Sequence, residues 1–197
     1  MKIRKILIYG SSELTRDTVN LLKDHYELVG HIPSVNPVLS GTVDLPVVDE
    51  LVDHDIKLSL QYNRRIKNTE NAYNVHTGLL PLWGGTDILY HTLKEPVTEQ
   101  GITFHKMSES FDYGSIVSKV IYPVLQDDSM VSLYNRLHAL FPAFTLSSLK
   151  LLESLSASDV DRLPKFKPRV FKRGCVEDCD IETYKQTLPI LKDKYEY

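Results

Sequence analysis

Compact apolar runs alternate with amphipathic stretches through the first sixty residues. The runs at 5–9, 27–32 and 56–60 are rich in isoleucine, leucine and valine, which is typical of strands buried on both faces. Apolar positions recur near helical spacing over residues 14–23, and the three prolines and one glycine of residues 33–46 predict a surface excursion. Strands separated by helices predict an α/β, Rossmann-like fold with a central, mostly parallel sheet flanked by helices.

Shorter signals predict further elements along the chain. Apolar positions within residues 47–52 predict the opening of a short helix, and residues 74–76 are strand-like. The glycine-rich residues 78–85 predict a loop that leads into a helix starting at 88–93. Residues 169–171 have the character of a short strand.

The second half of the chain predicts a pair of strands and a long helix. Residues 101–107 and 114–124 predict two antiparallel strands around a loop that carries Asp112. Residues 129–155 place apolar side chains on one helical face. We expect Pro142 to kink or divide this helix, because proline lacks the N–H group of an internal helical residue.

Composition and charge exclude several classes of protein. With 197 residues, of which 42% are hydrophobic and 25% charged, the chain has the balance of an ordinary soluble protein with one domain-sized core. Its formal net charge of -3 gives no global attraction to nucleic acid or to an anionic membrane, and we expect neither as a partner. No apolar run approaches the ~20 residues of a membrane helix. We therefore expect a cytoplasmic location.

The chain has two cysteines, Cys175 and Cys179, with Asp178 and Asp180 beside them. Two thiols do not complete a zinc site. A pair of unrelated thiols is the commoner origin of such a spacing. We expect no bound metal.

The turn Gly10-Ser11-Ser12 follows the first predicted strand. Small residues between a strand and a helix present backbone N–H groups to an anion, helped by the helix dipole, so a phosphate group of a small substrate is one candidate ligand. The G-x-G-x-x-G spacing is missing and no acidic residue ends the second strand, which argues against a nicotinamide cofactor. The alternative is a tight turn that needs small side chains.

Three motifs between residues 74 and 119 carry the strongest signal. They read Asn-Val-His-Thr-Gly-Leu-Leu-Pro-Leu-Trp-Gly-Gly at 74–85, Gly-Ile-Thr-Phe-His-Lys-Met at 101–107 and Phe-Asp-Tyr-Gly-Ser-Ile-Val at 111–117. Their order and gaps resemble the folate-dependent formyltransferase family, which includes glycinamide ribonucleotide, methionyl-tRNA and nucleotide-sugar N-formyltransferases. The resemblance implies the formyltransferase fold and transfer of a formyl group from 10-formyltetrahydrofolate, as co-substrate, to the primary amine of a small acceptor.

On that resemblance, Asn74, His76 and Asp112 form the catalytic triad. The chemistry asks for such a set, because negative charge develops on the formyl oxygen when an amine attacks the formyl carbon. Asn74 and a charged His76 can donate hydrogen bonds to that oxygen. Asp112 can hold the charge of the ring and, with water, relay the proton that the amine loses. The alternative is a buried structural histidine and an aspartate that caps a loop; we interpret His105, which also matches a family position, as structural.

The resemblance also places the pterin of the folate beside residues 60–66, where main-chain groups of similar enzymes cradle it. Backbone N–H and C=O groups can bind the amide-like edge of a pterin whatever the side chains are. The expected wall residues are Tyr62, Asn63, Arg64 and Ile66 on one side and Leu79, Leu80 and Pro81 on the other. The alternative for the first group is an ordinary exposed loop.

Departures from the family pattern bear on the acceptor. Thr77-Gly78 replaces the usual Pro-Ser, and Gly84 stands where an arginine commonly lies. These changes reshape the pocket or, in the extreme case, weaken the activity. The separate barrel with which methionyl-tRNA enzymes bind tRNA is not expected, and the phosphate turn of glycinamide ribonucleotide enzymes is not evident. A nucleotide-linked amino sugar is therefore the preferred acceptor, with glycinamide ribonucleotide as the alternative and an inactive folate- or nucleotide-binding protein as the alternative of another class.

We expect residues 1–155 to form the formyltransferase catalytic domain and residues 156–197 to form an extension that packs on the same domain or at a homodimer interface. The extension contains a basic run interleaved with Phe166 and Phe171, with cations at Lys165, Lys167, Arg169, Lys172 and Arg173. Such a run contacts the phosphates of a substrate or nucleic acid, or it forms a solvated face or an edge strand.

Overall fold

The structure is a computed structural model of the chain and describes residues 2–34 and 43–171. In chain order its elements are β1 (Lys5–Tyr9), α1 (Glu13–Leu22), β2 (Glu27–Ile32), β3 (Ile56–Leu60), β4 (Ala72–His76), β5 (Gly84–Gly85), α2 (Ile88–Lys94), β6 (Glu99–Lys106), β7 (Ile116–Pro123), α3 (Met130–Ser154), α4 (Ala157–Arg162) and β8 (Val170–Phe171). The first three strands coincide with the predicted ranges. Strands β1 and β3 are almost entirely buried, whereas β2 lies at the edge of the sheet and buries only Gly30 and His31.

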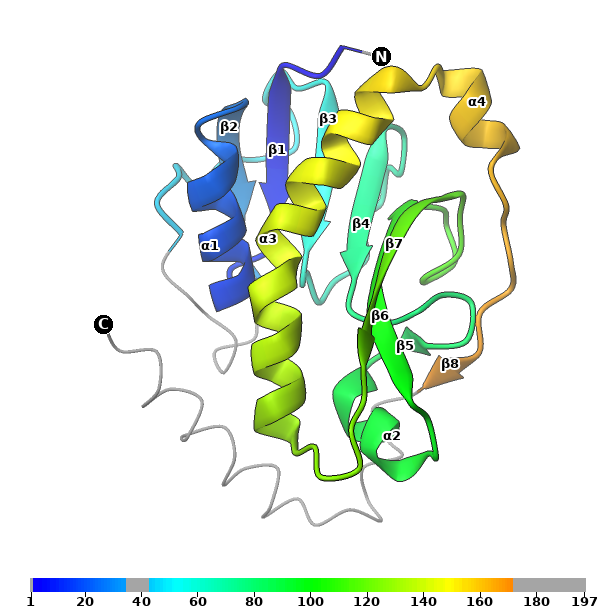
Figure 1. The fold of residues 1–197 in the computed structure, drawn as a ribbon. Helices are drawn as coiled ribbons and strands as arrows, with labels where there is room; N and C mark the ends of the chain where they lie inside the picture. The colour runs from blue at the N-terminus through cyan, green and yellow to red at the C-terminus, as the bar shows by residue number, and fades with distance from the viewer. Residues whose placement is uncertain (1, 35–42, 172–197) are drawn as a thin grey trace.

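A six-stranded sheet with the order β2-β1-β3-β4-β6-β7 forms the centre of the fold (Figure 1). Strand β1 pairs in parallel with β2 and β3, and β3 pairs in parallel with β4. The pairs β4–β6 and β6–β7 are antiparallel. The predicted α/β class with a mostly parallel sheet flanked by helices is confirmed.

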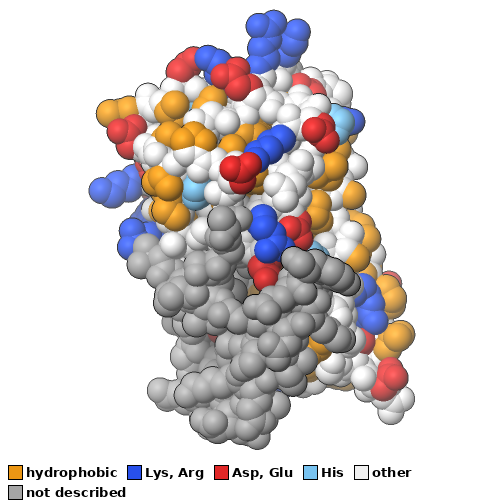
Figure 2. Space-filling model, turned by 90° about the vertical axis from the view of Figure 1, so that its left-hand side faces the viewer, with side chains coloured by type: hydrophobic (Ala, Val, Ile, Leu, Met, Phe, Trp, Pro, Cys, Tyr) orange, Lys and Arg blue, Asp and Glu red, His pale blue; other side chains and the backbone are white. Residues whose placement is uncertain are grey.

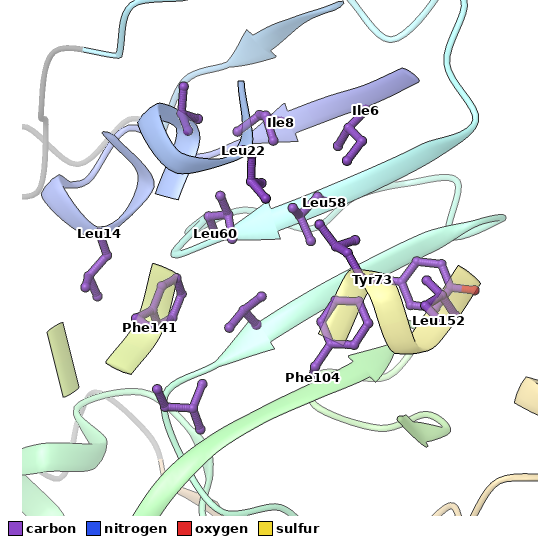
Figure 3. Close-up of a cluster of buried hydrophobic side chains, with 14 of the residues drawn as sticks. Ile6, Ile8, Leu14, Leu22, Leu58, Leu60, Tyr73, Phe104, Phe141 and Leu152 are labelled. Atoms are coloured by element: carbon purple, nitrogen blue, oxygen red, sulfur yellow. The ribbon is translucent and has the colours of Figure 1, made fainter. Parts of the chain in front are cut away.

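Helices α1 and α3 pack side by side over one face of the sheet (Figure 1). Ser12 caps the N-terminus of helix α1, and its side chain accepts a hydrogen bond from the N–H group of Thr15 in a capping box. The apolar side chains between these helices and the sheet form the main core. Those that Figure 3 labels include Ile6, Ile8, Leu58 and Leu60 from the sheet and Leu14, Leu22, Phe141 and Leu152 from the helices.

The other face of the sheet holds a smaller cluster around Leu7, Tyr9 and Ile66, against which Val48 packs. The predicted helix at residues 47–52 is wrong. The N–H group of Val48 bonds to the carbonyl oxygen of His31 in β2, and the Asp49 side chain accepts a bond from the N–H group of Leu51. A local aspartate turn of this kind competes with helix formation.

Helix α3 runs through Pro142 as one helix of 25 residues. Of the two expected effects of Pro142, division of the helix is therefore wrong, and a kink stays a prediction. Leu133, Leu137 and Phe141 before the proline and Leu149 after it are all buried, so the core packs against the helix on both sides of the missing hydrogen bond.

Within residues 2–34 and 43–171, no helix combines the length and the apolar character needed to cross a bilayer. On the face turned to the viewer in Figure 2, basic and acidic side chains are interspersed over the described surface. This mixed surface shows no single-signed patch for a polyanion on that part of the molecule.

Candidate active site

A cavity of about 490 Å³ lies at the carboxyl end of β3 and β4. Ligand sites of α/β sheets commonly form at this edge, and the volume is in the range of small-molecule sites. Its lining includes Asn74, His76, His105 and Asp112. Strand β4 presents Asn74 and His76, two positions apart and therefore on the same face of the sheet.

A second hollow of about 590 Å³ lies among Lys2, Arg4 and Lys150 at the opposite end of β1. It is larger but more open, and it contains none of the residues that the motifs single out. The chemistry of the side chains, rather than the volume, therefore identifies the cavity at β3 and β4 as the candidate site.

Protein acceptors face both ring nitrogens of His76. The Nε2 atom lies 2.6 Å from the carbonyl oxygen of Trp83, and Nδ1 lies 3.4 Å from Oδ1 of Asp112. Since only an N–H group can face a carbonyl oxygen at this distance, Nε2 carries a proton. The side chains of His76 and Asp112 are only 7% and 11% exposed, so this contact is largely shielded from solvent.

Asp112 is fixed by backbone as well as by His76. Its Oδ2 atom accepts a 2.6 Å hydrogen bond from the N–H group of Gly85. Its own backbone has a φ of 51°, in the left-handed region that aspartate tolerates better than most residues. The loop between β6 and β7 thus aims this carboxylate into the cavity.

The antiparallel register of β4 and β6 places His105 opposite Asn74. The Nδ1 atom of His105 lies 3.0 Å from the carbonyl oxygen of Lys106, so it carries the proton and leaves Nε2 as an acceptor. Nε2 lies 3.3 Å from Nδ2 of Asn74. This contact orients the amide of Asn74 and leaves its second N–H for a ligand in the cavity. Burial lowers the pKa of His105 well below its ordinary value, which keeps the ring neutral.

We expect the stability of the protein to fall between pH 7 and pH 5, in part because of His105. Its pKa is lower in the folded than in the unfolded state, so the unfolded chain binds more protons below about pH 6.5 and stability is lost as the pH falls. The loss is at most about 1.4 kcal/mol per pH unit for one group. Carboxylates with a lowered pKa, such as Asp128, contribute only below about pH 4.

Urea unfolding of His105→Asn at pH 7 and pH 5 tests this expectation. The variant should show a smaller difference between the two pH values than the unmodified chain. His25→Asn is the control, because His25 is exposed. An unchanged difference in His105→Asn would contradict the assignment.

The cavity lining includes the four residues expected on the first pterin wall. Tyr62, Asn63, Arg64 and Ile66 all contact it, from the segment that follows β3. Ile66 is at the same time buried against Leu7 in the smaller core cluster, so this segment is more than an exposed loop.

The three residues expected on the opposite wall lie outside the cavity lining. The N–H groups of Leu79 and Leu80 bond to the side chains of Gln100 and Thr103 in β6, and the carbonyl oxygen of Pro81 accepts a bond from Arg169. Buried polar side chains of β6 thus draw this loop inward. The far side of the cavity is formed instead by Gly85, Thr86, Asp87, Ile88, Val170 and Phe171.

The turn at Gly10, Ser11 and Ser12 also lies outside the cavity lining. The N–H groups of Gly10 and Ser12 are already bonded, to the carbonyl oxygen of Ile32 and to the hydroxyl of Thr15. A Cβ atom on Gly10 would lie 2.0 Å from the carbonyl oxygen of Leu60. These contacts favour the tight-turn alternative, and phosphate binding here stays a prediction.

The structure describes only part of the basic run and neither cysteine of residues 156–197. Arg169 pairs with Glu95, while Lys165 and Lys167 are exposed. Lys172, Arg173 and both cysteines lie outside the described residues. No group of three or more histidine, cysteine, aspartate or glutamate side chains is arranged to hold a metal ion within the part of the chain that the structure describes.

Long-range strand pairing adds two contacts to the site. The structural role expected of His105 stays a prediction, and the register of β6 brings its ring to the amide of Asn74. The short strand expected at residues 169–171 is present as β8, and the structure pairs its residues Val170 and Phe171 with Gly84 and Gly85. The signal for this pairing was the double glycine itself, which leaves room for a neighbouring strand.

Comparisons with known proteins agree with this geometry. The family model described as formyl transferase matches residues 66–147. That range contains Asn74, His76, His105 and Asp112.

Solved structures share the fold at low sequence identity. An N-formyltransferase from Helicobacter canadensis, in complex with folinic acid and dTDP-3-aminofucose, has a TM-score of 0.72 and 18% identity over 87% of this chain and 72% of its own. WlaRD, a sugar 3N-formyl transferase, has a TM-score of 0.73 and 18% identity over 90% of this chain and 72% of its own. A phosphoribosylglycinamide formyltransferase from Bacillus halodurans has a TM-score of 0.64 and 17% identity over 79% of this chain and 97% of its own. The resemblance drawn from the motifs is confirmed: the chain has the formyltransferase fold, and residues 66–147 carry the sequence pattern of the formyl transferase family.

Proposed function

We propose that this protein transfers a formyl group from 10-formyltetrahydrofolate to the primary amine of a small acceptor, with a nucleotide-linked amino sugar as the preferred acceptor. The observation that carries the proposal is the convergence of Asn74, His76 and Asp112 in one cavity of about 490 Å³. A match of the formyl transferase family model to the same part of the chain supports it.

The folate side of the cavity fits a pterin. Residues 61–66 and 107–111 line it from two segments, and Tyr62 and Met107 supply apolar surface. Arg64 and Arg65 stand at the same side, and the Arg65 guanidinium bonds to the carbonyl oxygen of Glu109, which ties the two segments together. Backbone groups and apolar walls of this kind suit a flat heterocycle with an amide-like edge. The bound folate supplies the formyl carbon and the leaving nitrogen.

Asn74 stabilises the formyl oxygen as negative charge develops on it. His105 holds one N–H of the amide, so the other is already oriented when the ligands bind. A donor fixed before the reaction loses no free energy to reorientation in the transition state.

His76 donates a hydrogen bond to the formyl oxygen, and Asp112 accepts a proton. Both nitrogens of the ring have protein partners, so a bond from His76 to the formyl oxygen requires one contact to open. The contact to Asp112, at 3.4 Å, is longer than the 2.6 Å contact to Trp83. Asp112 then accepts the proton of the attacking amine, directly or through water, and the nitrogen of the folate takes up a proton as its bond to the formyl carbon breaks.

The far side of the cavity favours a sugar as acceptor. Asp87 and Thr86 offer oxygen atoms to hydroxyl groups, and Phe171 offers an apolar surface to the ring. Among the described residues of that side there is no lysine or arginine to bind a phosphate next to the reacting amine. The dTDP-3-aminofucose bound by the Helicobacter canadensis enzyme supports this choice. The likeness to the Bacillus halodurans enzyme keeps glycinamide ribonucleotide as the alternative.

A thermal-shift titration with folinic acid tests the folate part of the proposal. At one hundred times the dissociation constant we expect the melting temperature to rise by roughly 5–10 °C for a domain of this size. Arg64→Ala, in the cavity, should reduce the shift at a given concentration, and Arg162→Ala, at the end of α4, should not. No shift with any folate would contradict the proposal.

Transfer is then measured with dTDP-linked amino sugars and glycinamide ribonucleotide side by side. We expect formylated product from an amino sugar. If product forms only from glycinamide ribonucleotide, the alternative acceptor is the correct one. Folate binding without transfer to any acceptor would support the alternative of a binding protein.

A further inference from the structure

Residues 164–171, which we call the crossing segment, lead from α4 to the loop formed by residues 83–85, where Val170 and Phe171 pair in parallel with Gly84 and Gly85 (Figure 1). The N–H group of Gly84 bonds to the carbonyl oxygen of Arg169 at 2.9 Å, and that of Thr86 bonds to Phe171 at 3.0 Å. The N–H group of Arg169 bonds in turn to the carbonyl oxygen of Pro81 at 2.9 Å. Backbone bonds thus fix the loop to a segment that lies far from it in the sequence.

Side chains strengthen the same contact. The rings of Phe171 and Trp83 stack, with their centroids 5.0 Å apart and an angle of 11° between their planes. The ring of His91, on α2, has its centroid 4.5 Å from that of Phe171. The guanidinium group of Arg169 lies 4.5 Å above the Phe171 ring and binds both carboxylate oxygens of Glu95. An arginine that is stacked and bidentate is held in one orientation.

The loop held in this way provides the backbone partners of the proposed catalytic pair. The carbonyl oxygen of Trp83 accepts the bond from His76, and the N–H group of Gly85 donates to Asp112, both at 2.6 Å. Only Gly84 separates these two residues, and Gly84 is itself bonded to Arg169. A displacement of the loop would therefore move the partners of His76 and Asp112 together.

The glycines fit this arrangement. A Cβ atom on Gly84 would lie 2.9 Å from Cβ of Pro168, and one on Gly85 would lie 2.1 Å from the carbonyl oxygen of Phe171. In this chain the crossing segment occupies the space into which a side chain at residue 84 would extend.

We propose that Arg169 and Phe171 are positioning residues, which set the orientation of His76 and Asp112 through the backbone of Trp83 and Gly85. The expected effect on formyl transfer rests on the proposed function. The effect of Arg169 and Phe171 on the position of the loop does not. The crossing segment is then a working part of the active site, although neither residue touches the reacting atoms.

The first test needs no enzyme activity. Long-range ¹H–¹⁵N spectra, assigned with His76→Gln, follow the Nε2 proton of His76. We expect its signal in the unmodified chain and its loss through solvent exchange in Phe171→Ala and Arg169→Ala. Phe171→Tyr, which keeps the stacked ring, should retain the signal, as should the controls Phe166→Ala and Lys167→Ala in the same segment. Trp83 is the only tryptophan, so its emission reports loosening of the stack directly. Far-ultraviolet circular dichroism verifies that each variant is folded.

The second test is the rate of formyl transfer. A small misplacement of reacting groups lowers kcat by on the order of ten- to a hundredfold. We expect that loss in Phe171→Ala and Arg169→Ala, with an altered pH profile of kcat, an unchanged KM for the folate and recovery in Phe171→Tyr. A retained His76 signal in both alanine variants, its equal loss in the controls, or an unchanged kcat after its loss would each overturn the inference. If the unmodified chain transfers no formyl group, the proposed function fails. The His76 signal alone then tests whether Arg169 and Phe171 hold the loop in place.

Discussion

Replacing Asp112 by asparagine should reduce kcat for formyl transfer by roughly 10²- to 10⁴-fold, the range for loss of a group that transfers protons. Asparagine has nearly the same shape and still offers an oxygen to the N–H group of Gly85, so the loop should keep its structure. The variant loses the negative charge beside His76 and the ability to accept a proton. Steady-state rates and a folinic acid thermal shift on the same preparation separate the two effects, because folate binding should survive.

Asp161→Asn is the matched control for this substitution. Asp161 is more than half exposed and pairs with Lys106 outside the cavity, so the same chemical change there should leave kcat within about twofold, since surface ion pairs contribute little. An Asp112→Asn enzyme that keeps more than a tenth of the unmodified rate would remove Asp112 from the proposed mechanism.

Replacing Asn74 by alanine should lower kcat by about 10²- to 10³-fold, the effect of removing one donor to a developing oxyanion. The amide donates to an oxygen whose charge grows only in the transition state, so KM for either substrate should change little. The substitution also leaves Nε2 of His105 without the amide of Asn74.

Asn20→Ala, on the exposed face of α1, serves as the control for truncation of an asparagine. Rates that fall equally in both variants, or an Asn74→Ala enzyme within threefold of the unmodified kcat, would show that the amide does not stabilise the transition state.

The local parts of the fold were predictable from sequence, and the long-range parts were not. Strands β1 and β3 are runs that each end in a turn, and their bounds follow from that pattern. The error at residues 47–52 arose because apolar spacing says nothing about an aspartate side chain that bonds to Leu51. The continuity of α3 through Pro142 depends on core contacts on both sides of the proline.

The candidate site shows the same division. Motif spacing singled out Asn74, His76 and Asp112, and the structure brings all three to one cavity, while their catalytic roles stay predictions. The partnership of Asn74 with His105 requires the register of two antiparallel strands, which no local pattern specifies. The inward position of Leu80 likewise depends on Thr103 in a neighbouring strand.

The missing side chain of Gly10 matters beyond its own turn. The carbonyl oxygen of Leu60 occupies the space and also accepts the hydroxyl of Thr15 at 2.7 Å, so the start of α1 rests on the last residue of β3. Gln61 follows directly, with a φ of 59°, and begins the segment that lines the proposed folate side of the cavity. A larger side chain at residue 10, introduced to build a new anion site, would therefore first disturb the segment proposed to bind the pterin, although residue 10 does not line the cavity itself.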